Sequence, residues 1–264
     1  TVDKDARTAE IDFTGTTAQL ATNYNAPEPV TRAAVLYVFR LLVADQIPMN
    51  EGVMKPLKVI LPPGTMLSPA YPAAVIAGNV ETSQAVTSAL LLALGVQAAA
   101  QSTMNNTTWG NAAHQYYETI CGGSGAGYNH DGSLHPGTGG VHTHMTNSRL
   151  TDPEILEQRF PVVLDWFHVR PQSGGAGKYA GGNGVERHIR FLQPMRANII
   201  SGHRQVAPHG LHGGHDGKTG VNFVLRHQGR MQRLSGCACV ELEAGDLFCI
   251  HTPGGGGFGA AAEG

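Results

Sequence analysis

Charged side chains are scarce in this 264-residue chain, where Asp, Glu, Lys and Arg make up 14% of the residues, against about 25% in an ordinary domain. The 18 Lys and Arg residues are balanced by 20 Asp and Glu, which gives a formal net charge of −2. A protein that neutralises many phosphates needs an excess of basic side chains, so we expect no nucleic-acid partner. The chain has less charged surface than most monomers, and we expect an oligomer.

Cysteines and long apolar runs are also few. Four cysteines are not a disulfide framework in a chain of this length, and no signal peptide opens the sequence, so we expect a cytoplasmic protein. The longest apolar run, residues 89–96, is far shorter than the ~20 residues of a membrane span, and no membrane partner is expected. A hydrophobic content of 41% at low net charge excludes disorder.

The first part of the chain mixes strand and helix patterns. Residues 9–14 alternate as a strand does, residues 30–42 carry apolar side chains at the helical period, and residues 57–61 read as a second strand. Asn79 is placed as the N-cap of a further helix that runs to about Ala99. Because Thr1 stands so close to the first strand, we interpret the chain as a piece of a longer protein.

A run of 36 residues, from Thr82 to Tyr117, contains no charged side chain. A helix without a charged face is packed on several sides, so we expect the helix in this run to be buried. The polar, uncharged residues 101–108 that follow must find hydrogen-bond partners if they are buried. We therefore predict that they either cap structure or line a pocket.

From about residue 159 the sequence pattern changes to short β-type runs between glycine-rich turns. The predicted strands lie at residues 162–164, 185–192, 198–200, 222–226, 239–242 and 247–250. The expected fold class is α+β, with mixed helices and strands over residues 1–158 and a mostly antiparallel β part over residues 159–264.

All 13 histidines lie at or after His114, and the sharpest arrangement is His142 and His144. Two residues apart on an extended segment, their imidazoles would point to one face and could move a proton, hold an anion or bind a metal. The alternative is a pair of hydrogen-bonded structural histidines beside the helix start at residues 151–154, where Thr151 or Asp152 would be the N-cap and Pro153 the first helical residue.

Glu118 is the first acidic residue after the uncharged run, and it precedes the glycine loop at residues 122–127. A carboxyl group in apolar surroundings can have a raised pKa and transfer protons. Alternatively, Glu118 pairs with an arginine such as Arg149. The N–H groups of the loop could cradle an oxyanion or a phosphate, or the loop is only a turn.

Nucleotide and metal motifs are incomplete. Residues 217–219 and 175–180 resemble a phosphate loop and a dinucleotide fingerprint, but each lacks required positions. The histidines at 209, 212 and 215 and the thiols at 237 and 239 do not give four zinc ligands at ordered spacing. We predict neither a nucleotide site nor a metal site in this chain.

Several segments together resemble the C-terminal half of the hydantoinase B / 5-oxoprolinase family, which includes acetone and acetophenone carboxylase large subunits. They run in family order: Ile11–Thr16, Asn25–Pro27, Ile47–Gly52, Gly78–Gln84, Thr103–Asn106, Tyr116–Thr119, Gly140–Asn147, Thr151–Glu154, Gly181–Gly184 and Thr252–Gly259.

This resemblance implies ATP-dependent opening of a lactam or imide ring, with the conversion of 5-oxoproline to glutamate as the favoured reaction. It implies that ATP and Mg are bound by an actin-like hydantoinase A-type partner, and that an N-terminal half of the same family, which allows a metal site, precedes Thr1. A hydantoinase B subunit and a ketone carboxylase subunit are the alternatives, and so is a non-catalytic scaffold that docks the ATPase.

The resemblance also ranks the candidate site residues. Glu118 or His142 would move the proton, while His144 and Asn147 would orient the substrate or its oxyanion. Amide side chains can bond the donor and the acceptor of a cyclic amide. The expected substrate-binding residues are Asn79, Glu81, Ser83, Gln84, Asn105, Asn106 and Ser124. We expect them to surround one polar, uncharged cleft beside the buried helix.

Overall fold

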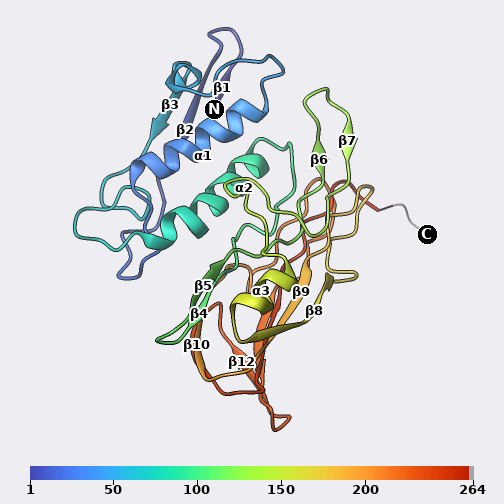
Figure 1. The fold of residues 1–264 in the computed structure, drawn as a ribbon. Helices are drawn as coiled ribbons and strands as arrows, with labels where there is room; N and C mark the ends of the chain where they lie inside the picture. Colours follow the sequence, from blue (N-terminus) through green and yellow to red (C-terminus); the bar gives the residue numbers. More distant parts are fainter. Residues whose placement is uncertain (262–264) are drawn as a thin grey trace.

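Two helices and a small sheet lie above two larger sheets in the computed structural model, which describes residues 1–261 (Figure 1). The predicted α+β class is confirmed. Within the described residues, no helix combines the length and the apolar character needed to cross a membrane.

The helical part is built around α1 (Glu28–Leu41), whose buried stripe contains Ala34, Val35 and Val38. This stripe packs against α2 (Ser83–Ala93), and the two helices run side by side in Figure 1. A three-stranded sheet packs against the helix pair, with the strand order β1 (Val2–Asp3), β2 (Thr8–Asp12), β3 (Leu57–Ile60). A short 3₁₀ turn, η1 (Glu51–Met54), leads into β3. The predicted strands and first helix are therefore confirmed.

The helix predicted from Asn79 to Ala99 is shorter and begins differently. A π-helical turn, η2 (Gly78–Thr82), precedes α2, so that Asn79 lies exposed inside the turn and is not an N-cap. The helix ends at Ala93, because Gly95 adopts φ +68°. The expected burial is confirmed: every exposed residue of α2 is an alanine, at positions 85, 89 and 93.

Two antiparallel sheets face each other below the helices. One has the order β13 (Cys237–Leu242), β10 (Met195–Ile200), β4 (Asn106–Gly110), β5 (Gln115–Glu118). The other has the order β12 (Met231–Leu234), β11 (Val221–Leu225), β14 (Leu247–His251), β9 (Val185–Phe191), β8 (Val162–Val169). All six strands predicted after residue 159 are present, whereas β4, β5 and β12 were not predicted.

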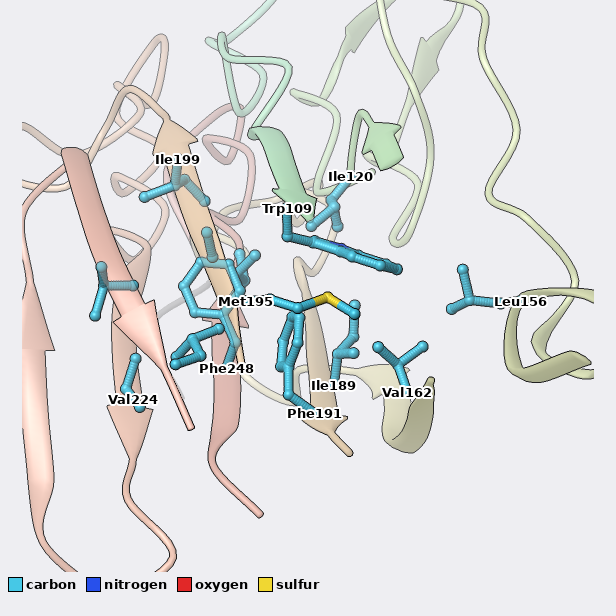
Figure 2. Packing of buried hydrophobic residues seen from close by; sticks show 14 of the residues in the cluster. Trp109, Ile120, Leu156, Val162, Ile189, Phe191, Met195, Ile199, Val224 and Phe248 are labelled. Carbon is cyan, nitrogen blue, oxygen red and sulfur yellow. The ribbon is translucent and has the colours of Figure 1, made fainter. Parts of the chain in front are cut away.

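The apolar core lies between these two sheets (Figure 2). Residues of β9 alternate, with Val185, Ile189 and Phe191 facing inward, as a half-buried strand requires. The Trp109 ring of β4 packs edge-on against Phe191, with the ring centroids 5.4 Å apart. A short helix, α3 (Pro153–Arg159), closes one side, and Asp152 caps it by accepting from the N–H of Glu154 and Ile155, as predicted.

The division at residue 158 stays a prediction. Strands from both sides of this boundary share one sheet, because β4 pairs with β10 along its whole length. The sheets and the helical part are connected by segment 94–105 and by a glycine-rich layer, to which the hairpin of β6 (Gly127–Tyr128) and β7 (Leu134–His135) belongs. In that layer a Cβ on Gly255 would lie 1.9 Å from the carbonyl oxygen of Ser124, so glycine is required by close backbone contact.

Candidate functional site

Glu118 forms a buried ion pair that joins the two large sheets. Its carboxylate on β5 accepts from Nε and Nη2 of Arg187 on β9, at 2.7 and 3.0 Å. Both side chains are almost completely buried. Tyr116 also donates to Glu118 and lies close to Thr151, and burial, followed by the charge of Glu118, raises the pKa of this phenol to about 12.

The arginine partner of Glu118 is therefore Arg187 and not Arg149. A carboxylate held in two charged hydrogen bonds is a structural anion, and proton transfer by Glu118 stays a prediction that this pairing disfavours. The pair connects residues 69 positions apart, which explains why the sequence did not reveal it.

His142 and His144 do not lie on a strand. Only Val141 makes a bridge, to Gly122, and His144 adopts φ +58° in the turn that follows. Tyr37 of α1 approaches the Nδ1 of His144 at 3.4 Å, whereas the Nε2 of His144 and both ring nitrogens of His142 are buried without a partner in the described chain. Burial lowers the pKa of both rings, that of His144 to about 4. Both imidazoles are therefore neutral at pH 7.

The glycine loop does not form an anion cradle. The N–H groups of Gly122, Gly123, Ser124 and Ala126 all donate to backbone carbonyls, so they have no hydrogen left for a ligand. The Ser124 hydroxyl accepts from the N–H of Thr138. Asn147, which follows this loop in the sequence, is exposed. Of the two readings of residues 122–127, these contacts favour the turn, and Ser124 as a substrate-binding residue stays a prediction.

Glu81 is the centre of a buried polar network at the junction of the helical part and the sheets. Its Oε1 accepts from the Thr103 hydroxyl at 2.8 Å, from the Met104 N–H at 3.2 Å and from the Asn106 amide at 2.9 Å. Burial raises its pKa to about 7, against the opposing effect of these hydrogen bonds and of the charge of Arg204. Glu81 therefore changes its charge near neutral pH.

The two asparagines support this network, and Asn106 also lines a cavity of about 330 Å³. Asn105 donates to Gln101 Oε1 and to the carbonyl of Ile120, and its oxygen accepts from Arg204. Asn106 donates to Glu81 and accepts from the Tyr117 hydroxyl. Both amides are thus already satisfied, so binding a ring would require them to break existing bonds.

Ser83 and Gln84 are buried at the start of α2. Ser83 donates back to the carbonyl of Asn79, and Gln84 donates to the carbonyl of Thr143 at 3.1 Å. Gln84 therefore fixes the loop that carries His142 and His144 against α2.

Arg204 is a cation that the sequence reasoning missed. It follows β10 and donates to Asn105, to Asn222 and to the carbonyl of Gly202, at 2.7 to 3.2 Å. Burial lowers its pKa to about 9, and the charge of Glu81 opposes this change. A guanidinium with this pKa stays charged at pH 7. An isolated arginine after a β-type run gives no pattern from which this role could have been read.

A cavity of about 450 Å³ opens beside Arg204. The walls come from four parts of the chain, and they include Tyr24, Ser201, Arg204, Asn222, Arg233 and Cys237. The Tyr24 hydroxyl lies 2.7 Å from the Sγ of Cys237 and connects the helical part to β13. Burial and the contact with Cys237 raise the pKa of Tyr24, so this phenol is neutral at pH 7. His142 and His144 do not line this cavity.

Neither nucleotide-like stretch fits a phosphate. The N–H groups of Gly217 and Lys218 donate to the carbonyls of Pro208 and Ser173, and that of Gly175 donates to Gly255. A phosphate loop needs such N–H groups to be free. We therefore assign no step of ATP chemistry to these residues.

The Hydantoinase B/oxoprolinase family model matches residues 1–261. The chain belongs to this family. It is 47% identical to "5-oxoprolinase 1" of Arabidopsis thaliana over 98% of this chain and 20% of that relative. The present chain therefore spans about a fifth of the length of that curated relative.

Two solved structures have the same fold. An ATP-dependent caprolactamase from Pseudomonas jessenii aligns over 96% of this chain and 47% of its own, with a TM-score of 0.80 and 21% identity. A nucleotide-free acetone carboxylase aligns over 98% of this chain and 40% of its own, with a TM-score of 0.83 and 19% identity. At these identities the likeness establishes the family fold alone.

The pairing of Glu118 with Arg187 is tested by single and double substitutions. Glu118→Gln or Arg187→Met alone should lower the free energy of unfolding by about 3–5 kcal/mol, because each leaves a buried charge without its partner. The double variant should lose clearly less than the sum of the two. Urea unfolding followed by circular dichroism measures all three, and additive losses would contradict the ion pair.

The pKa of Glu81 predicts how the stability of the protein depends on pH. Its folded pKa of about 7 lies above the ordinary 4.5, so the folded state holds a proton that the unfolded chain releases between these values. Stability contributed by the neutral carboxyl is thus lost as pH rises from about 4.5 to 7. Glu81→Gln should escape this loss and gain up to about 3 kcal/mol relative to wild type across the interval.

Urea unfolding at a series of pH values measures this difference between Glu81→Gln and the wild type. The matched control is Glu154→Gln, at an exposed position, which should follow the wild type. A difference that stays constant between pH 4.5 and 7.5 would show that Glu81 is ionised throughout.

Proposed function

We propose that this chain is the C-terminal part of an ATP-dependent hydrolase that opens a cyclic amide, with 5-oxoproline converted to glutamate as the favoured reaction. The observation that carries the proposal is the 47% identity to a protein named 5-oxoprolinase over nearly the whole chain. The two related structures, a caprolactamase and an acetone carboxylase, are about 20% identical. The lactam branch with 5-oxoproline is therefore favoured over the ketone carboxylase branch.

The cavity beside Arg204 suits the carboxylate of 5-oxoproline. Arg204 and Arg233 both line it, and a small cationic cavity attracts a small anion. Arg204 already donates four hydrogen bonds within the protein, one to Gly202, one to Asn105 and two to Asn222. A guanidinium has five N–H groups, which leaves one for a ligand. Arg233 is exposed at the rim and supplies the second charged donor.

Glu81 acts in this proposal as a positioning residue. It fixes Thr103, whose hydroxyl also accepts from the N–H of Gly202, two residues before Arg204, at 2.9 Å. Its charge also stabilises the guanidinium, because the two groups attract each other. Protonation of Glu81 near pH 7 therefore weakens the hold on Arg204, which makes substrate affinity depend on pH in the same range.

The imidazoles of His142 and His144 are candidates for proton transfer. Both are neutral and have ring nitrogens without a partner in the described chain, which is the state of a general base. Asn147 stays a candidate for orienting the substrate. These histidines do not line the cavity of Arg204. If they transfer a proton, parts of the protein outside this chain must bring the substrate to them.

Ring opening also needs groups outside this chain. The proposal assigns ATP and Mg to an actin-like hydantoinase A-type module, and it includes an N-terminal half of the same family. A cytoplasmic, oligomeric enzyme that supplies glutamate for glutathione metabolism is consistent with this assignment.

The proposal is tested with the whole protein that contains this chain. ATP hydrolysis should depend on 5-oxoproline and should match glutamate formation one to one. Stimulation by hydantoin would favour a hydantoinase B subunit, and stimulation by bicarbonate with a ketone would favour a carboxylase subunit. If no ring or ketone stimulates the ATPase although the ATPase module requires this chain for binding, the chain is a docking scaffold and the proposal fails.

The carboxylate site predicts a specific loss in Arg233→Ala. Removing one charged donor should raise the KM for 5-oxoproline about tenfold, with a smaller change in kcat. Arg230→Ala, at an exposed position that does not line the cavity, is the matched control and should keep the wild-type KM. Equal KM values for the two variants would remove the cavity from the substrate site.

A further inference from the structure

Metal-ligating side chains gather on the face of the five-stranded sheet that points away from the core. His168 on β8, Glu186 on β9 and His251 on β14 lie directly opposite one another across three neighbouring strands. His188 lies two residues after Glu186, so it points to the same face. The inward neighbours on β9, Val185 and Ile189, belong to the apolar core.

Three of these side chains converge on one point. The Nε2 atoms of His188 and His251 are 2.8 Å apart, and their ring planes differ by 9°. The Oε2 of Glu186 lies 3.6 Å from the Nε2 of His251. All three ligand atoms lie within 4.8 Å of one another. In the described part of the chain this is the one group of three or more such ligands.

The surroundings hold the two imidazoles in place. The ring of Phe223 on β11 contacts both edge-on, with centroids 6.0 and 5.2 Å from those of His188 and His251. Burial lowers the pKa of both histidines, that of His251 to about 4. Both rings are therefore neutral at pH 7, which is the form that binds a metal.

The charged neighbours of the cluster do not block a cation. Arg170 follows β8, and its charge helps to lower the pKa of His251, but its Nη1 donates to the carbonyls of Thr219 and Thr252. Glu186 supplies the compensating negative charge. His168 has its Nε2 occupied by the indole N–H of Trp166, at 3.2 Å, and lies 3.6 Å from Glu186.

We propose that Glu186, His188 and His251 bind one divalent transition-metal ion of the zinc class, with water in the remaining position. Two imidazoles and one carboxylate with an open position are a common ligand set for Zn²⁺. This site goes beyond the proposed ring-opening function, because it lies on strands of this chain that the function does not use.

Metal binding requires both imidazoles to turn, because a centroid distance of 5.1 Å with the Nε2 atoms 2.8 Å apart means that the two rings meet end to end. Metal–ligand bonds of about 2.0–2.2 Å at tetrahedral angles place ligand atoms about 3.3–3.6 Å apart. The separation between Glu186 and His251 already has this value. The two Nε2 atoms, now 2.8 Å apart, must therefore separate by about 0.5–0.8 Å. The histidine whose Nε2 carries the proton in the metal-free pair must change to its Nδ1–H tautomer, so that both Nε2 lone pairs face the ion.

Sequence reasoning missed this cluster because its ligands are distant along the chain. His188 and His251 are 63 residues apart, and only the pairing of β9 with β14 brings them together. The histidines at 209, 212 and 215, which are close in sequence, do not converge: His209 approaches Asp216, and His212 contacts the carbonyl of Gly95.

The proposal is tested by metal binding to the purified chain in its parent protein. After chelation, Co²⁺ should give the intense visible bands of a four-coordinate site, and Zn²⁺ should quench them at one equivalent. His188→Ala and His251→Ala should each remove one bound metal per chain, and Glu186→Gln should weaken binding at least tenfold. His130→Ala, in an exposed loop, is the matched control and should keep the full stoichiometry.

Thermal unfolding gives a second readout that does not depend on activity. Zn²⁺ at 100-fold excess over its Kd should raise the Tm of the wild type by roughly 5 °C or more, with no such rise for His188→Ala. In the presence of chelator the variants should retain wild-type circular dichroism. Equal metal content and Tm shifts in the wild type and His188→Ala, or no stoichiometric metal in the wild type, would overturn the proposal and leave a histidine pair joined by one hydrogen bond.

Discussion

The structure depends on satisfying polar groups that are buried where the helical part meets the sheets. An unpaired polar group at such a place costs about 1–3 kcal/mol, and a charged one costs more. Here Glu81 is buried and Arg204 is half-buried, and Thr103, Asn105 and Asn106 lie between them as hydrogen-bond partners. Segment 101–108 is polar but uncharged. Its amides and hydroxyls bond to Glu81 and Arg204, two groups of opposite charge, and it adds no third charge to this region.

This network also determines where a ligand can bind. Asn105 and Asn106 already hydrogen-bond to their neighbours. The donors that remain for a ligand are those of Arg204 and of the other residues that line its cavity, which include Tyr24 and Arg233. The buried ion pair between Glu118 and Arg187 joins the two large sheets. The contacts of Glu81 and Arg204 thus orient one wall of the cavity, and the pairing of Glu118 with Arg187 favours a structural role for Glu118 over proton transfer.

Local patterns were enough to predict much of the fold. The alternation in β9, the apolar stripe of α1 and the Asp152 cap are all set by neighbouring residues, and each was placed correctly. Sequence failed where the outcome depends on distant partners. The segment around His142 alternates like a strand, but it turns at His144 because only Val141 finds a partner for its backbone. The glycine loop resembled an anion cradle, but the N–H groups of Gly123 and Ala126 donate to carbonyls 130 residues later in the chain, at Pro253 and Gly256.

The candidate site shows the same limit more strongly. Glu81, Asn105 and Asn106 were selected, and they do lie together, but Arg204, Asn222 and Tyr24 were not, because no spacing connects them. The most direct test of the account is hydrogen exchange of the whole protein with and without 5-oxoproline, followed by mass spectrometry. The account predicts that 5-oxoproline slows exchange in segments 102–106, 201–206 and 231–237, around the cavity. Turnover of 5-oxoproline with unchanged exchange in these three segments would contradict it.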